Sequence, residues 1–177
     1  MRIISGINRG RVLKAPTWDG LRPTSDKLRE TLFNILAPYI EGARVLDVFS
    51  GTGAVALEAL SRGAAAATCI EQDRRAVKLI EENRALCGAA DRCVIIRDAA
   101  ERALSKPVAG GPFDVVVLDP PYDHDRLAAV VQAAATQRAP GARLVLEHAS
   151  RVAPPAPEGL AVARTVKSGD SALTFYS

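Results

Sequence analysis

The residues best suited to chemistry are Asp119-Pro120-Pro121-Tyr122, which follow an apolar run over 113–118. Two consecutive prolines fix φ and remove two N–H donors, so this turn exposes acceptors: the Asp119 carboxylate and the Pro120 carbonyl. Tyr122 adds an aromatic face beside them. Two acceptors and a stacking surface suit an aryl amine, because hydrogen bonds to both N–H protons aim its lone pair at an electrophile. The sequence therefore predicts Asp119, Pro120 and Tyr122 as catalytic residues acting on an unpaired or flipped-out base.

A second chemical cluster is the glycine-rich segment at 50–53, which follows the apolar run 45–49 and precedes a helical pattern from Ala54. Strand, tight glycine turn and helix in succession are typical of a nucleotide-binding βαβ unit. Glycine permits unusual φ angles and lets backbone N–H groups approach a ligand closely. The residues predicted to bind a cofactor here are Asp47, Ser50, Gly51, Thr52 and Gly53.

Two acids end the next apolar runs. Glu71 lies 20 residues after Gly51, which is the usual distance for a carboxylate that binds ribose hydroxyls. Asp98 is placed to accept from an exocyclic amino group such as that of adenine, and Ala99 to donate its backbone N–H to the same ring. The structural alternative for an acid in such a place is a helix N-cap, which fits Asp98 better than Glu71.

These loops suit any adenosine cofactor, and Gly51, Gly53 and Ala56 fit a dinucleotide-binding pattern. Asp47 and the neighbouring hydroxyls disfavour a pyrophosphate and favour a cofactor that carries an ammonium and a sulfonium. The predicted cofactor is therefore S-adenosyl-L-methionine, with a nicotinamide oxidoreductase as the weaker alternative.

Alternating elements from Arg44 onward position these residues. Strands are expected at 44–49, 67–71, 92–97, 113–118 and 142–147, and helices at 53–62, 73–87, 98–105 and 124–137. Apolar strands alternating with helices indicate a parallel sheet covered on both faces, with ligands bound beyond the carboxyl ends of the strands. After a proline-rich break at 154–157, two β-prone runs at 160–167 and 172–176 predict an antiparallel hairpin at the sheet edge. A further helix is expected from residue 24 to 37.

The composition is that of one α/β domain over residues 1–177. No apolar run reaches the length of a membrane span, and the first residues have no signal-peptide core, so we expect a cytoplasmic protein without a membrane partner. Three cysteines without a C-x-x-C spacing predict buried thiols and no metal site.

The positive charge is concentrated at the N-terminus. The net charge of the chain is +3, and residues 1–18 contain four basic side chains and no acid. Short β-prone runs at 2–4 and 11–13 predict a small basic hairpin within an arm over 1–23. We expect the arm to contact RNA phosphates, a solvated surface hairpin being the alternative. The residues predicted to do so are Arg2, Arg9, Arg11 and Lys14.

The glycine loop, Glu71, Asp98 and the 119–122 turn together resemble class I S-adenosylmethionine-dependent methyltransferases that act on exocyclic amines of bases. The segments 1–6, 10–11 and 22–36 are similar to those of the RsmD-type bacterial rRNA methyltransferases. The resemblance implies a Rossmann-like fold, with a mostly parallel seven-stranded sheet and a terminal antiparallel strand. It implies methylation of N2 of the guanine at position 966 of 16S rRNA, within a 30S subunit or an assembly intermediate, by a monomer.

The resemblance also assigns roles to residues. It places the glycine loop at the methionine part of the cofactor, Glu71 at the ribose and Asp98 at the adenine, with Tyr122 stacked on the guanine. Arg22 and Thr24 are expected to line the same pocket, and a surface role for Arg22 stays open. Other activities also stay open: an adenine-N6 or protein-glutamine methyltransferase, and a non-catalytic RNA-binding assembly factor. Because position 119 is Asp rather than Asn, methylation of guanine is favoured over methylation of adenine N6 or of protein glutamine.

Overall fold

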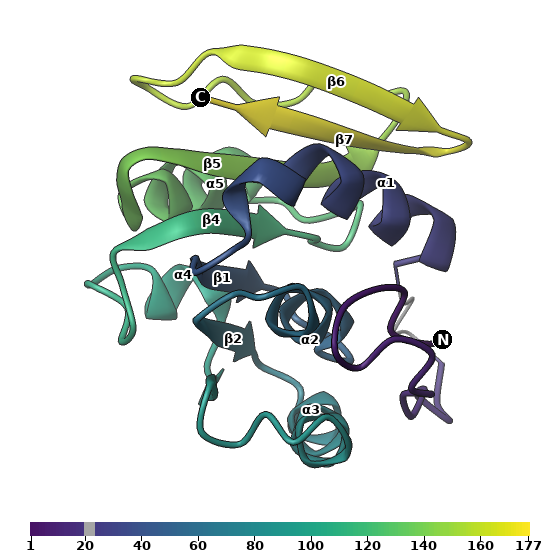
Figure 1. The fold of residues 1–177 in the computed structure, drawn as a ribbon. Coiled ribbons are helices and arrows are strands. Elements are labelled where there is room, and N and C mark those ends of the chain that lie inside the picture. The colour runs from purple at the N-terminus through teal and green to yellow at the C-terminus, as the bar shows by residue number, and fades with distance from the viewer. Residues whose placement is uncertain (20–23) are drawn as a thin grey trace.

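The computed structural model describes residues 1–19 and 24–177 and builds them around a seven-stranded sheet (Figure 1). Five strands, β1 to β5, pair in parallel, and β7 pairs antiparallel with both β5 and β6. The order across the sheet is β3-β2-β1-β4-β5-β7-β6. This confirms the predicted Rossmann-like fold and its antiparallel hairpin. The strands are β1 (Arg44–Val48), β2 (Ala66–Glu71), β3 (Cys93–Arg97), β4 (Phe113–Leu118), β5 (Arg138–Ala149), β6 (Val162–Ser168) and β7 (Ser171–Tyr176).

Helices cover both faces of the sheet. Alternate strand residues point to opposite faces, so each buried strand supplies two cores. Val45, Val117 and Val145 pack with α1, α2 and α3, whereas their neighbours in sequence pack with α4 and α5. The helices are α1 (Asp26–Leu36), α2 (Ala54–Ser61), α3 (Arg74–Leu86), α4 (Ala100–Ala103) and α5 (Leu127–Ala135), with a 3₁₀ turn η1 (Ala37–Tyr39) after α1. No helix in the described parts of the chain is long and apolar enough to cross a membrane.

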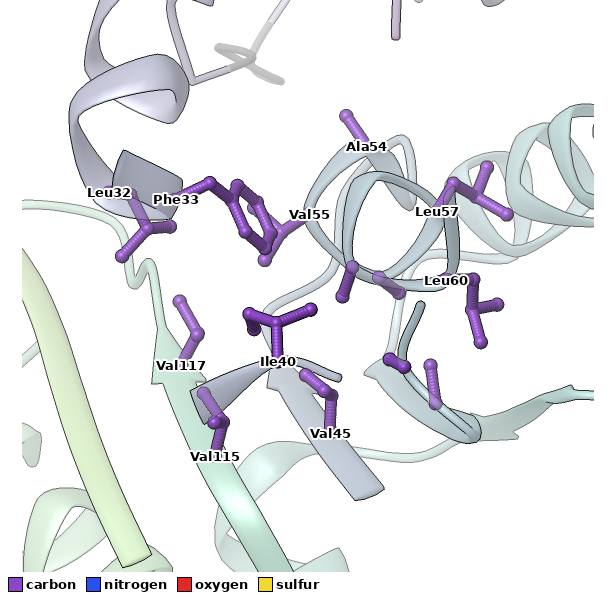
Figure 2. Close-up of a cluster of buried hydrophobic side chains, with 14 of the residues drawn as sticks. Leu32, Phe33, Ile40, Val45, Ala54, Val55, Leu57, Leu60, Val115 and Val117 are labelled. Atoms are coloured by element: carbon purple, nitrogen blue, oxygen red, sulfur yellow. The ribbon is translucent and has the colours of Figure 1, made fainter. Parts of the chain in front are cut away.

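The core on the α1–α3 side fixes α1 and α2 against the middle of the sheet. Figure 2 shows Phe33 of α1 beside Val55 of α2, above Val115 and Val117 of β4. Phe33 is 1% exposed, and Val55 and Val115 are equally part of this buried cluster. Because α1 and α2 both pack here, the segment before α1 and the loop before α2 are held close to the carboxyl ends of β1 and β4.

Several element bounds differ from those predicted. β5 begins at Arg138 rather than 142, and its register with β4 shifts between Phe113 and Val115, which accommodates the extra residues. α4 has only four residues instead of the predicted eight. α5 begins at Leu127 rather than 124, because the turn after Pro121 continues to Arg126, whose N–H donates to His124 Nδ1. His124 therefore precedes α5 instead of lying in its first turn.

Within residues 1–19, the described part of the N-terminal arm, the chain is hairpin-like but forms no paired strands. One antiparallel bridge joins Arg2 and Val12, and no longer ladder forms because backbone groups of the arm bind helices instead. Ile4 N and Ser5 N donate to the Glu58 carboxylate of α2 at 2.8 and 3.0 Å. Lys14 N donates to Asn83 Oδ1 of α3 at 2.7 Å. The arm is thus docked on α2 and α3, beside which Figure 1 shows it.

Candidate active site

A cavity of about 720 Å³ lies where β1, β2, β4 and β5 end. Strand order reverses between β1 and β4, which is the place where open α/β sheets bind ligands. Most of the predicted site residues line this cavity: Thr24, Asp47, Ser50, Gly51, Thr52, Glu71, Asp98, Asp119, Pro120 and Tyr122. Gly53 and Ala99 are not among the lining residues, and the four basic residues of the arm lie elsewhere on the surface. Arg22 is outside the described residues.

The glycine loop turns sharply through left-handed backbone conformations. Phe49, Gly51 and Gly53 have φ of 64°, 55° and 76°. A positive φ is uncommon for a residue with a Cβ, so Phe49 is a strained position, of the kind that clusters at functional sites. At Gly53 a Cβ would come within 3.0 Å of Ile80 Cγ2 on α3, so glycine is required both for conformation and for space.

Asp47 lies beneath the start of α2. α2 begins after Gly53 without a side-chain cap, and Asp47 Oδ2 accepts from Ala56 N at 3.2 Å. A carboxylate in this place satisfies one of the helix's unpaired N–H groups and complements its dipole. Burial is the main cause that raises the pKa of Asp47 well above its usual range, with the charges of Asp119 and Glu71 adding to it. Asp47 reaches the cavity, and its direct contact with a cofactor stays a prediction.

Glu71 joins the ends of β1 and β2. Its two carboxylate oxygens accept from Gly51 N and from Asp73 N, both at 2.9 Å. Glu71 is not the N-cap of α3, which is Asp73, but it holds both the glycine loop and the turn before α3. An ionised carboxylate has about four acceptor positions, so these two bonds leave room for ribose hydroxyls.

Asp98 stands at the edge of the cavity below β3. Asp98 Oδ1 accepts from Ala99 N at 2.8 Å and also from Arg102 Nε. Ala99, not Asp98, occupies the N-cap position of α4, and α4 has no side-chain cap. The N-cap alternative for Asp98 is therefore wrong, and the N–H of Ala99 binds this carboxylate.

The Asp119-Pro120-Pro121-Tyr122 turn lies across the cavity from the glycine loop, as predicted. Thr24 Oγ1 donates to Asp119 Oδ2 at 2.5 Å, which ties the turn to the segment before α1. Tyr122 is 44% exposed, and its hydroxyl lies 2.5 Å from Ser171 Oγ at the start of β7. The hydroxyl is therefore fixed while the ring remains available to a ligand.

Glu147, near the end of β5, is a site residue that the sequence analysis missed. It is 7% exposed, lines the cavity, and lies 3.5 Å from the Tyr122 hydroxyl. Its pKa is raised to about 8, mainly by burial and secondly by the charge of Asp119. The available signal was its position: like Asp119, it is an acid directly after an apolar run, here residues 144–146.

Acidic side chains predominate over basic ones in the lining of the cavity. Among the described lining residues Arg75 is the only Lys or Arg, and it pairs with Asp73 at 2.7 Å. A cavity of this kind attracts a cofactor with a sulfonium and an ammonium and repels a pyrophosphate, so the donor set fits S-adenosylmethionine and disfavours a nicotinamide dinucleotide. The acids that line it are Asp19, Asp47, Glu71, Asp73, Asp98, Glu101, Asp119, Glu147 and Asp170.

The two histidines have different surroundings. His124 lines the cavity, packs its ring edge-on against Phe49 at 5.3 Å, and has Nε2 3.2 Å from Glu101 Oε1. His148 is buried, with Nε2 2.8 Å from Thr174 Oγ1 of the neighbouring strand β7. His148 is therefore a structural residue of the sheet.

Comparison with known proteins places the chain in a family. The family model described as conserved hypothetical protein 95 matches residues 1–177. The chain belongs to this family. Ribosomal RNA small subunit methyltransferase D of Escherichia coli (strain K12) is 48% identical over 122 residues, which are 69% of this chain and 60% of that protein. The Haemophilus influenzae protein of the same name is 41% identical over 72% of this chain and 66% of its own length. The resemblance to RsmD-type methyltransferases is thus confirmed.

Solved structures of other proteins have the same fold. The yhhF protein from Escherichia coli matches with a TM-score of 0.88 and 38% identity, covering 99% of this chain and 96% of that one. A more distant match is an RNA methyltransferase from Salinibacter ruber in complex with S-adenosyl-L-homocysteine, with a TM-score of 0.66 and 20% identity over 87% of this chain and 92% of that one. At that identity the likeness concerns the fold alone.

Proposed function

We propose that this protein transfers a methyl group from S-adenosyl-L-methionine to the exocyclic N2 amine of a guanine in 16S rRNA. The observation that carries the proposal is the acceptor-rich Asp119-Pro120 turn facing the glycine loop across one acidic cavity. The names of the family members support methyl transfer to small-subunit rRNA. The guanine N2 target, and position 966, follow from the resemblance and from the chemistry of the turn.

The cofactor supplies an electrophilic methyl group on a sulfonium. Gly51, Gly53 and the hydroxyls of Ser50 and Thr52 surround its methionine part, with Asp47 adding negative charge beneath. Glu71 takes the ribose hydroxyls. The adenine lies at Asp98 and Ala99. Arg22, predicted to meet the methionine carboxylate or an RNA phosphate, completes this assignment.

The acceptor side uses the opposite wall of the cavity. The Asp119 carboxylate and the Pro120 carbonyl accept the two N–H bonds of the amine, which turns its lone pair toward the methyl group. Thr24 keeps the Asp119 carboxylate in one orientation through its 2.5 Å hydrogen bond. Tyr122 stacks on the guanine. Because methylation itself makes the amine acidic, its proton leaves afterwards without a strong base.

The docked arm is the proposed RNA contact. Arg2, Arg9 and Arg11 have exposed side chains on a backbone that is fixed to α2 and α3. Lys14 is also exposed, and its Nζ pairs with Glu82 Oε2 at 2.9 Å, so it adds less to an RNA-binding surface. In the proposal these fixed cations bind the backbone of an RNA while one base enters the cavity.

The remaining parts of the proposal concern context. Residues 1–177 act as one methyltransferase domain with the basic arm over 1–23, as a monomer in the cytoplasm. The substrate is a 30S subunit or an assembly intermediate. The testing experiment is incubation of the protein with labelled cofactor and 30S particles that lack the modification, followed by nucleotide mapping. Label on N2 of one guanine supports the proposal, and label on an adenine or a protein contradicts it.

A further inference from the structure

Glu147 is a buried acid inside the cavity that the proposed mechanism leaves without a role. β4 and β5 lie side by side in the sheet (Figure 1). They pair in parallel with Leu118 opposite Leu146, so Asp119 and Glu147 are the next pair along the two strands. Leu118 and Leu146 face α5, whereas Val117 and Val145 face α1. Alternation therefore puts Asp119 and Glu147 together on the α1 face, where Thr24 also meets Asp119.

The side chain of Glu147 contacts polar groups on the acceptor side of the cavity. Its carboxyl group hydrogen-bonds with Asp119 and Ser171, and the Tyr122 hydroxyl is 3.5 Å from its Oε1. An acid that is 7% exposed is costly to bury, so a purely structural position would be better filled by an apolar side chain. The position of this acid, on the cavity wall and beside the group that takes the amine, points to a ligand.

The Watson–Crick edge of guanine carries a hydrogen-bond donor that Glu147 could accept. Beside the N2 amine, guanine carries a second donor, the N1–H, whereas adenine has an unprotonated N1 acceptor beside its N6 amine. We propose that Glu147 reads this edge: one carboxyl oxygen accepts the N1–H of the target guanine while its other oxygen is held by Asp119. The inference rests on the proposed function and adds to it the residue that selects guanine over a base with a bare N1.

The protonation of the pair agrees with this arrangement. Burial keeps the pKa of Glu147 near 8, so at neutral pH its carboxyl group holds a proton and donates it in a hydrogen bond to Asp119. In the proposed arrangement its other oxygen is then the acceptor offered to the base in the cavity, which Glu147 lines. A base with a lone pair at N1 meets this acceptor unfavourably, because a site built for an N–H rejects an analogue that lacks it.

The test is a base replacement combined with two variants. The target guanine of 16S rRNA, reconstituted into 30S particles, is replaced by 2,6-diaminopurine, which keeps the N2 amine but has no N1–H. We expect the unmodified protein to methylate guanine about 10- to 100-fold faster than the analogue. Glu147→Leu removes the acceptor and should bring the ratio near one. Glu147→Gln keeps a carbonyl and a donor toward Asp119, so it should keep the ratio.

Several results overturn the inference. One is a Glu147→Leu protein that slows both substrates equally, which is what a structural role predicts. A second is a Glu147→Gln protein that loses the preference for guanine over 2,6-diaminopurine as fully as the leucine variant does. A third is an unmodified protein that shows no such preference, and this result overturns the inference even if the leucine variant does not fold. Cofactor binding by calorimetry checks folding, and Glu81→Gln on the exposed side of α3 is the charge-matched control. If guanine itself receives no methyl group at N2, the proposed function fails, which is a different result from an unselective transfer.

Discussion

The raised pKa of Glu147 predicts how replacing it changes stability with pH. In the unfolded chain this carboxyl group ionises near its ordinary value of 4.5, whereas in the folded protein it ionises near 8. Its contribution to the free energy of unfolding is therefore fully present below about pH 4.5 and is lost as the pH rises toward 8. A glutamine at this position does not titrate, so Glu147→Gln should gain stability relative to the unmodified protein as the pH rises.

The size of the effect follows from the shift. Between pH 6 and the folded pKa, the free energy of unfolding of the unmodified protein falls by about 1.4 kcal/mol per pH unit relative to that of the variant. Above the folded pKa this decrease levels off. The stability difference between the two proteins should then grow by about 2 to 3 kcal/mol from pH 6 to pH 9. At 7% exposure, solvent screening reduces this little. Because Asp119 contributes to the shift, the titration belongs to the pair.

The assay is urea unfolding of both proteins at several pH values between 6 and 9, with equal slopes checked at each pH. Glu81→Gln removes an exposed acid of the same type and should show a stability difference that stays nearly constant with pH. A difference that stays flat for Glu147→Gln, or that shrinks as the pH rises, would show that the Asp119–Glu147 pair does not hold a proton in the folded state.

Two further predictions concern the glycine loop and the arm. Gly53→Ala should destabilise the protein by about 1 to 2 kcal/mol through its φ alone and more through Ile80, and should weaken cofactor binding in calorimetry. Gly141→Ala is the matched control, since Gly141 has the same φ of 76° with open space around it, and an equal loss of cofactor affinity in both variants would contradict the role of the loop. Neutralising the three exposed arginines of the arm should reduce the slope of log binding constant against log salt by about 2, measured by titration of RNA at several salt concentrations. An unchanged slope would mean that Arg2, Arg9 and Arg11 are ordinary surface charges that do not contact RNA.

The sequence predicted the sheet and the position of the site because both depend on local patterns. Apolar runs with β-branched residues mark buried parallel strands, and polar groups after such runs must converge at one edge of the sheet. Asp119 and the glycine loop therefore came together as expected, although they are far apart in the chain. Strand bounds were less accurate at β5, where a register shift lengthens the strand.

What the sequence did not predict depends on contacts between distant elements. The role of Glu147 requires knowing that β5 lies beside β4 and in which register. Glu58 of α2 accepts hydrogen bonds from two backbone N–H groups of the arm. Predicting these bonds requires knowing that the arm folds back onto α2. Asp47 lies within a strand, and only the position of α2 above it shows that it serves the start of that helix. None of these contacts can be predicted from the composition or the periodicity of the sequence.

The central claim is most directly tested by methylation of 30S particles with the unmodified protein and with Asp119→Ala, followed by mapping of the labelled nucleotide. We predict transfer to N2 of a single guanine by the unmodified protein, and a loss of at least about 100-fold in Asp119→Ala, since both the hydrogen bond and the orientation of the amine are removed. Cofactor affinity should be largely kept, and Asp91→Ala, an exposed acid elsewhere, should behave as the unmodified protein. A fully active Asp119→Ala protein, or label at any other acceptor, would contradict the account.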